Sequence, residues 1–322
     1  MDNGEILLEA IGEISDQLIL EAEKEPGHKN RSFIRNLIAA CLALCFVILP
    51  VNAEMRTGYI SNLLAPFYGG ARTEIVDSIG VPVGASVTVG DYTLTADAVI
   101  GDRYNIAIVY SLTHVDGKML PEGLRFDKWS DSGLRGGSGG GSMSHSLSSD
   151  GKTLFITEQW TSTERLFRIR RNVTRRFENL VIWKKGQEEE PLVQEGVWEL
   201  KFTVRYRDTT KTVPVKNISV TGGDGAEYTI QKMELSPVGL HLKMVGTPVR
   251  NDEHSLEMYK GFTVQLHLRD GRYMEVKDGN LGGGGKLEKG KFKWRYGAMF
   301  DTPVTLEEIQ SVVVCGTEIP VK

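Results

Sequence analysis

Residues 92 to 100, Y-T-L-T-A-D-A-V-I, alternate apolar side chains with mostly polar ones. The segment from Tyr104 to Leu112 alternates in the same way, and so do segments near the middle and the end of the chain: 198–206, 262–268 and 292–296. Successive side chains of a strand point to opposite faces, so this alternation predicts β-strands with one face toward water. The fold class that follows is mainly β, built as antiparallel sandwiches.

A weak internal sequence repeat suggests that the β region consists of two domains. Tyr92-Thr93-Leu94 and Tyr228-Thr229-Ile230 begin comparable stretches, and Pro214 lies close to the glycine cluster of residues 222–225. We therefore expect one β-sandwich over residues 80–210 and a second over residues 211–322. The glycines within 133–142 predict a flexible linker between strands, and those at 282–285 predict a hairpin turn.

An apolar segment over residues 33–53 carries no charge after Arg35. As a helix it would span roughly 31 Å, the thickness of a bilayer's hydrocarbon core. Excess positive charge before it (Lys24, Lys29, Arg31) places residues 1–32 in the cytoplasm. A stalk of residues 54–79 would lead to the exported β region. The prediction is a single-pass protein of the cell membrane whose span contacts membrane lipid.

A cleaved signal peptide is the alternative interpretation of this segment. Val51-Asn52-Ala53 resembles a small-residue cleavage site. The preceding region, however, is longer than 30 residues and acidic, whereas the start of a signal peptide is short and basic. The sequence favours retention of the span.

The cytoplasmic head, residues 1–32, carries an amphipathic pattern. Leu7, Ile11, Ile14 and Leu18 recur at helical spacing within a strongly acidic stretch. A helix this short is marginal alone in water, and its acidity disfavours the anionic inner leaflet. These four residues are therefore the candidate partner-binding stripe, with a basic protein groove as the natural partner. The alternative is a loosely ordered extension without a partner.

The cysteines, histidines and serines of the chain do not form a known catalytic or metal-binding motif. Cys41 and Cys45 lie in the apolar segment, so Cys315 is the only exported thiol and no disulfide can form in that region. No zinc-type spacing of cysteines or histidines occurs, and we expect neither metal nor cofactor. Residues 136–140, G-G-S-G-G, match the G-x-S-x-G motif without its strand-to-helix context. His241 and His267 fall in the polar registers of their strands, which predicts exposure. We expect a protein that is not an enzyme, with an exported hydrolase as a third interpretation.

Six arginines crowd into residues 165–176. The candidate polyanion contacts among them are Arg168, Arg170, Arg171, Arg175 and Arg176. The alternative is a solvated strand face balanced by the acidic run of residues 188–190. The chain holds 38 basic and 42 acidic side chains, a net charge of −4, so no overall field favours a polyanion and nucleic acid is not expected.

Three features together carry a family resemblance: the head L-L-E-A-I-G-E-I-S-D-Q-L-I-L-E-A (7–22), the single apolar segment, and V-T-V-G-D-Y-T-L-T-A-D-A-V-I-G-D (87–102). They resemble single-pass proteins of Gram-positive bacteria with an ectodomain of unknown function, often described as anti-sigma-factor-like. The resemblance implies that the second sandwich is an immunoglobulin-like domain. It also implies a cytoplasmic helix that holds a sigma factor or another cytoplasmic regulator. The head lacks the His-x-x-x-Cys-x-x-Cys of zinc-type anti-sigma domains and is shorter than a full sigma-binding domain.

The function expected from the sequence is that of a membrane-anchored regulatory protein, an anti-sigma-factor-like signal transducer with an extracytoplasmic sensing or binding region. The alternative is a cell-surface binding or envelope-scaffold protein whose head is only a topological anchor. The extracellular ligand is not specified by any motif.

Overall fold

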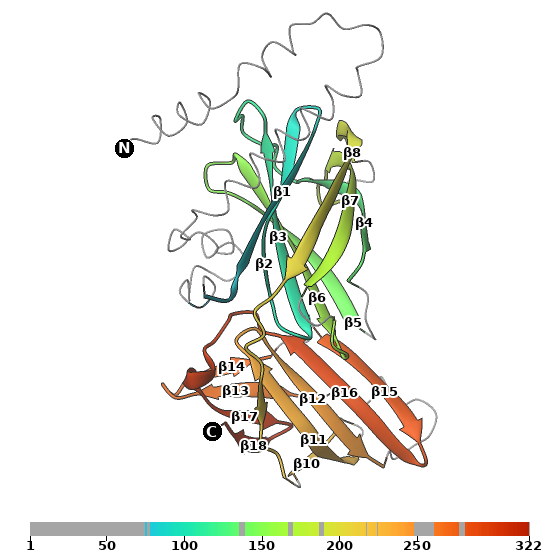
Figure 1. Cartoon of the computed structure of the whole chain (residues 1–322), viewed down its shortest axis with the longest axis vertical. Helices are drawn as coiled ribbons and strands as arrows, with labels where there is room; N and C mark the ends of the chain where they lie inside the picture. Colours follow the sequence, from blue (N-terminus) through green and yellow to red (C-terminus); the bar gives the residue numbers. More distant parts are fainter. Residues whose placement is uncertain are drawn as a thin grey trace, which may run out of the picture. The chain divides into compact units, whose positions relative to one another are not determined.

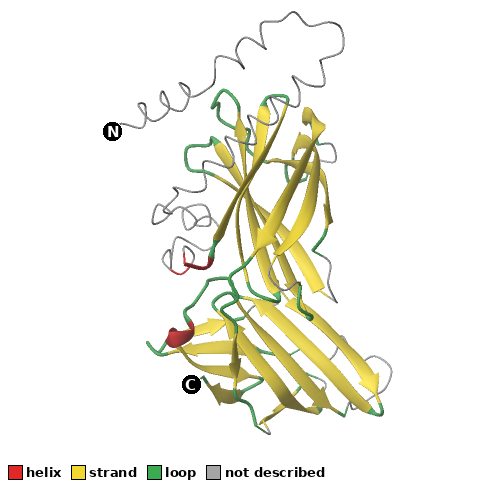
Figure 2. Cartoon of the chain, in the orientation of Figure 1, coloured by secondary structure: helices red, strands yellow, loops and turns green. Residues whose placement is uncertain are grey.

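The computed structural model describes residue 75 and residues 78–321, with gaps at 135–138, 167–169, 187–189, 217, 224, 248–260 and 277–280. The predicted head, the apolar segment 33–53 and most of the stalk lie outside these residues. Strands dominate the described region (Figure 2). The prediction of a mainly β, sandwich-like fold with antiparallel sheets is thus confirmed. Among the described residues, no helix combines the length and the apolar character needed to cross a membrane.

The first sandwich has a five-stranded and a three-stranded sheet (Figure 1). The order in the larger sheet is β1 (Val81–Val89), β2 (Tyr92–Gly101), β3 (Asn105–His114), β6 (Thr153–Ser162) and β5 (Gly139–Leu147). The smaller sheet contains β4 (Leu124–Ser132), β7 (Arg170–Ile182) and β8 (Leu192–Arg205). Their apolar faces enclose one core, in which Trp198 donates its indole N–H to the Tyr92 carbonyl oxygen at 3.0 Å.

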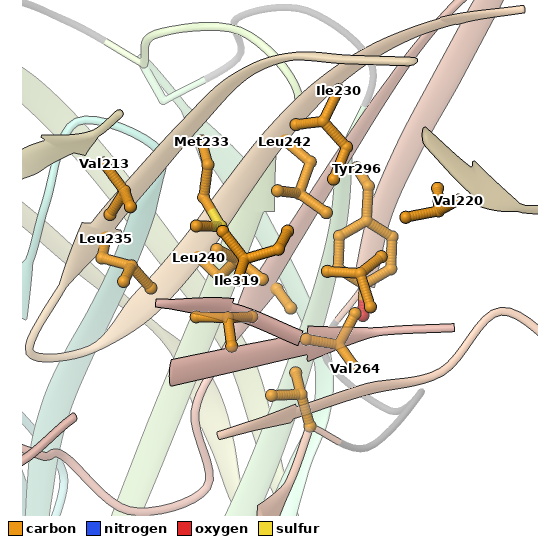
Figure 3. Packing of buried hydrophobic residues seen from close by; sticks show 14 of the residues in the cluster. Val213, Val220, Ile230, Met233, Leu235, Leu240, Leu242, Val264, Tyr296 and Ile319 are labelled. Carbon is orange, nitrogen blue, oxygen red and sulfur yellow. The ribbon is translucent and has the colours of Figure 1, made fainter. Parts of the chain in front are cut away.

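The second sandwich has a six-stranded and a four-stranded sheet. The larger contains β9 (Lys211–Val213), β10 (Ile218–Thr221), β11 (Glu227–Ser236), β12 (Gly239–Gly246), β16 (Lys291–Met299) and β15 (Leu281–Glu288). The smaller contains, in order, β14 (Tyr273–Glu275), β13 (Val264–Leu268), β17 (Ile309–Val314) and β18 (Thr317–Pro320). A 3-10 turn, η2 (Leu306–Glu308), comes directly before β17 in the chain. Side chains from both sheets interdigitate in its core, among them Leu240 and Leu242 of the larger sheet and Val264 and Ile319 of the smaller (Figure 3). The Phe262 and Trp294 rings also meet edge to face in this core, with ring centroids 4.6 Å apart.

Two glycine-rich segments contribute to strands, which corrects the turn expected at residues 282–285 and the last part of the linker expected over residues 133–142. Gly139 to Ser142 belong to β5, and Gly282 to Gly285 belong to β15. Glycine has no side chain to pack and is weak in strands. Here aromatic rings occupy the vacant space: a β-carbon at Gly141 would lie 3.0 Å from the Trp160 ring, and one at Gly285 would lie 2.1 Å from the Phe292 ring. Strand pairing and ring packing therefore hold both segments extended.

A third apolar cluster joins the two sandwiches. The outward faces of β2 and β3 contribute Ala98, Ile100, Ala107 and Val109, and the second sandwich contributes Val238 and Met299; Ile75 and Ile79 complete it. Because both faces of β2 and β3 are covered here, these strands lose the alternation of a wet sheet. The described part of residues 57–322 accordingly forms one compact unit.

Candidate functional site

A cluster of buried polar groups lies beside this apolar junction. It begins at the β2–β3 turn, where the Asp102 carboxylate accepts the backbone N–H groups of Tyr104 at 2.6 Å and Asn105 at 2.7 Å. An Asp that bonds the backbone two and three residues ahead is a common way to fix a turn. The Ser236 hydroxyl, from β11 of the second sandwich, donates to the same carboxylate. Burial raises the pKa of Asp102, and these hydrogen bonds only partly oppose the rise.

Glu234 of β11 is the centre of the cluster, with a side chain that is 0% exposed. Its carboxylate accepts the Arg103 guanidinium at 2.9 Å, the Tyr104 hydroxyl at 2.7 Å and the Lys232 ammonium at 2.8 Å. Burial alone would raise the pKa of Glu234, but the hydrogen bonds from Lys232 and Tyr104 and the nearby positive charges outweigh it and hold the pKa below its usual value. Two of the three donors come from the first sandwich, so this carboxylate ties the sandwiches together.

His241 of β12 packs flat against the Tyr104 ring, with ring centroids 3.9 Å apart and planes 6° from parallel. Its Nε2 lies 2.9 Å from the Thr163 carbonyl oxygen, which can only accept, so Nε2 carries the proton. The Nδ1 atom lies 3.9 Å from Glu234 Oε2. Burial lowers the pKa of His241 to about 4, because the charged imidazolium would lose its hydration.

The position of His241 corrects the expected exposure, since only 1% of the residue is accessible. Period-two alternation placed it on the polar face of β12, but the first sandwich covers that face at this point. Asp102 and Glu234 were likewise missed by sequence reasoning. The Asp102 turn carries a local signal, whereas the approach of Ser236, Glu234 and His241 depends on how the two sandwiches pack.

This arrangement holds the two sandwiches together, and its polar groups are not accessible to a substrate. Asp102, Glu234 and His241 are each at most 2% exposed, and their hydrogen-bonding oxygens and Nε2 contact protein groups. At its rim, the Arg295–Glu164 ion pair, at 2.5 Å, continues the connection between the sandwiches. Arg103 also pairs with Asp208, which lies in the segment between β8 and β9, at 2.7 Å. A residue that acts as a general base must reach a substrate proton, and these buried groups do not. The geometry is that of a rigid joint.

The contribution of His241 to stability should be lost as the pH falls. Between pH 6.5 and about 4 the unfolded chain protonates His241 while the folded chain does not, so the unfolded state binds more protons and stability decreases with falling pH. The loss attributable to His241 approaches about 3 kcal/mol at pH 4, at about 1.36 kcal/mol per pKa unit. Urea denaturation of His241→Gln and the intact chain at pH 7 and pH 4 measures it. From pH 7 to pH 4 the difference in unfolding free energy between the two proteins should shift by up to about 3 kcal/mol in favour of the variant, which has no imidazole to protonate. An unchanged difference would contradict the assignment.

The predicted arginine contacts separate into three groups. Arg170, Arg171 and Arg176 lie exposed on β7, and the first two keep the predicted availability to an anionic surface. Arg176 pairs with Glu178 at 2.8 Å. Arg168 lies outside the described residues. Arg175 is 0% exposed, which corrects its assignment as a surface contact.

Arg175 instead joins the two sheets of the first sandwich. Its Nε donates to Glu158 of β6 at 2.8 Å, and its Nη1 donates to the Ser132 carbonyl oxygen at 3.0 Å. The Tyr110 hydroxyl and the Trp160 indole N–H, each at 2.5 Å, also donate to Glu158. Burial would lower the pKa of Arg175, but the Glu158 charge outweighs it and raises that pKa. The arginine is therefore a structural element of the core.

Leu7, Ile11, Ile14 and Leu18 lie outside the described residues. Within those residues, no group of three or more His, Cys, Asp or Glu side chains is placed to hold a metal ion. The G-x-S-x-G match is only partly described, and its last two residues begin β5.

Comparison with known proteins identifies no family for this chain. No protein-family model and no curated protein matches the chain. Among solved structures, the chain is similar to the conserved domain protein from Bacillus anthracis, at 17% sequence identity and a TM-score of 0.45, with 73% of this chain and 76% of that chain covered.

Proposed function

We propose that this protein is a membrane-anchored regulator, anti-sigma-factor-like, with residues 80–322 as its extracytoplasmic sensing or binding region. The apolar segment 33–53, the basic residues before it and the amphipathic pattern of the head support this topology. In this proposal the span and the head are both helical, the second sandwich is immunoglobulin-like, and the protein is not an enzyme.

The structural observation that carries the proposal is the joint at Glu234. A carboxylate bonded by Arg103 and Tyr104 of one sandwich and Lys232 of the other fixes the two sandwiches as one body. A ligand that binds either sandwich therefore acts on the whole exported region and, through residues 54–79, on the membrane anchor. Two independently moving domains would dissipate such a displacement at their hinge. Rigid coupling of this kind suits a sensor.

The head provides the decisive experiment. Replacing Leu7, Ile11, Ile14 and Leu18 with serine removes about 1 to 2 kcal/mol of apolar burial at each position from any helix-in-groove contact. A micromolar complex has about 8 kcal/mol of binding free energy, so most of it would be lost. We expect transcription from the partner sigma factor's own promoter to rise in the altered strain.

Protein abundance is the control, because the span and the exported region are unchanged and membrane levels should stay normal. Unchanged transcription at normal abundance would mean that the head is only an anchor. The envelope-scaffold function would then replace the regulatory one. Co-purification with the intact head as bait identifies the cytoplasmic partner independently of transcription.

A further inference from the structure

The outer face of the five-stranded sheet carries two cross-strand rows of hydroxyl side chains. Thr88, Thr93, Thr113 and Thr153 lie directly opposite one another across β1, β2, β3 and β6. The second row runs parallel to the first and crosses all five strands: Ser86, Thr95, Ser111, Phe155 and Ser146. We call these nine positions the hydroxyl face. All nine are partly or fully exposed.

None of the nine positions carries a charge, which sets this face apart from the other sheet of the same sandwich. There, the outer positions of β7 and β8 hold Arg176 paired with Glu178, and Lys201 paired with Glu199, each pair at 2.8 Å. A charged outer face is the ordinary way to keep a sheet soluble. The nine side chains are uncharged, and an ionisable neighbour of theirs is the buried Asp97 carboxyl, which hydrogen-bonds the Ser111 hydroxyl.

The hydroxyls form a two-dimensional lattice. Neighbouring strands lie about 4.8 Å apart, and side chains two residues apart on one strand are separated by about 6.8 Å. Cross-strand pairs already bond to each other: Thr88 Oγ1 lies 2.8 Å from Thr93 Oγ1, and Thr95 donates to Ser86 at 3.3 Å. Each hydroxyl has one donor and two acceptor positions, so such pairs keep capacity for a ligand.

This chemistry excludes several classes of partner. Anionic polymers and nucleic acids are bound by lysine and arginine, which the face lacks. Protein interfaces are enriched in aromatic residues, methionine and arginine and depleted in serine, and here eight of nine positions are Ser or Thr. Drug-sized ligands need a concavity, whereas the side chains of this face belong to one sheet surface.

We propose that the hydroxyl face binds a neutral polysaccharide. A glycan chain repeats uncharged hydroxyls that both donate and accept, which matches the two rows in charge and in hydrogen-bonding capacity. The threonine methyl groups and the Phe155 ring offer apolar contact to the C–H groups of sugar rings. The inference names the ligand class of the exported region and in that respect rests on the proposed function.

The test measures retention of the purified full chain, in detergent, on chitin beads as an insoluble neutral polysaccharide. Thr93→Val with Thr113→Val removes two adjacent hydroxyls and preserves the branched shape. We expect the dissociation constant to rise at least tenfold. The matched control is Thr174→Val with Thr203→Val on the charged outer face of β7 and β8, which should bind like the intact chain. Thr93→Ser with Thr113→Ser restores the hydroxyls and should retain binding.

Three outcomes would overturn the proposal: no retention of the intact chain on chitin, equal retention of both valine variants, or stronger retention on heparin agarose than on chitin. Sedimentation velocity tests a further occupant, because self-association that disappears only in Thr93→Val with Thr113→Val would assign the face to a second copy of this chain. The assay requires no cytoplasmic head, so its failure is distinct from a failure of the transcription experiment.

Discussion

Replacing Arg175 with methionine is expected to lower the free energy of unfolding by about 3 to 5 kcal/mol. Arg175 and Glu158 both have side chains with 0% exposure, and their charged atoms lie 2.8 Å apart. Methionine occupies a similar space but leaves the Glu158 carboxylate buried without its cation, which is costly in a low-dielectric interior. Urea denaturation of the purified chain, followed by tryptophan fluorescence, measures the change.

The neighbouring Arg176 provides the matched control. It is exposed and pairs with Glu178 at the surface, so Arg176→Met should change the unfolding free energy by about 0.5 kcal/mol or less. Adding Glu158→Gln to Arg175→Met should recover part of the loss, because a neutral amide needs no counter-charge. Equal destabilisation by the two arginine variants would contradict a special role for the buried pair.

Replacing Asp97 with asparagine is expected to raise the free energy of unfolding at pH 8 by up to about 4 kcal/mol and to leave it nearly unchanged at pH 3.5. Asp97 lies at a bulge in the pairing of β2 with β3 and is 7% exposed. Burial raises its pKa to about 7, with the Ser111 hydroxyl opposing the rise. Between pH 3.8 and 7 the folded chain holds a proton that the unfolded chain releases, so stability is lost as the pH rises. Asparagine has no proton to lose.

The measurement is urea denaturation of both proteins at several pH values. A constant difference between them across this range would show that Asp97 is ionised in the folded state and would refute the prediction. His241 has the opposite sign, because its contribution is lost as the pH falls below 6.5. In the intact chain the two effects oppose each other between pH 4 and 6.5. Each single variant should therefore show a steeper pH dependence than the intact chain.

The alternating strands could be predicted because their pattern is local. The segments read from Tyr92, Tyr104 and Trp198 correspond to β2, β3 and β8. The glycine-rich strands β5 and β15 could not be predicted, because a run of glycines shows no alternation of apolar and polar side chains. β5 depends on pairing with β6, and β15 depends on pairing with β16. Their stability comes from partners distant in sequence.

The burial of Arg175 was indicated by its strand register, but the crowding of arginines around it led to the opposite prediction. Arg175 shares the register of Val173 and Phe177, both buried, so alternation alone would have placed it inside the sandwich. The crowding of arginines suggested a surface instead. His241 is the converse case, since its register was polar and only the packing of the other sandwich buries it. Alternation assigns a side chain to a face, and tertiary contacts decide whether that face is covered.

The joint at Glu234 also bears on how such a chain can change over generations. A gene that kept only residues 211–322 would encode Glu234 without Arg103 and Tyr104 and would expose Val238 and Met299 to water. A gene that kept only the first sandwich would expose Ala98 and Ile100 of β2. Recombination between the sandwiches would thus produce two poorly folding halves. The segment that can be transferred intact from one gene to another is the pair.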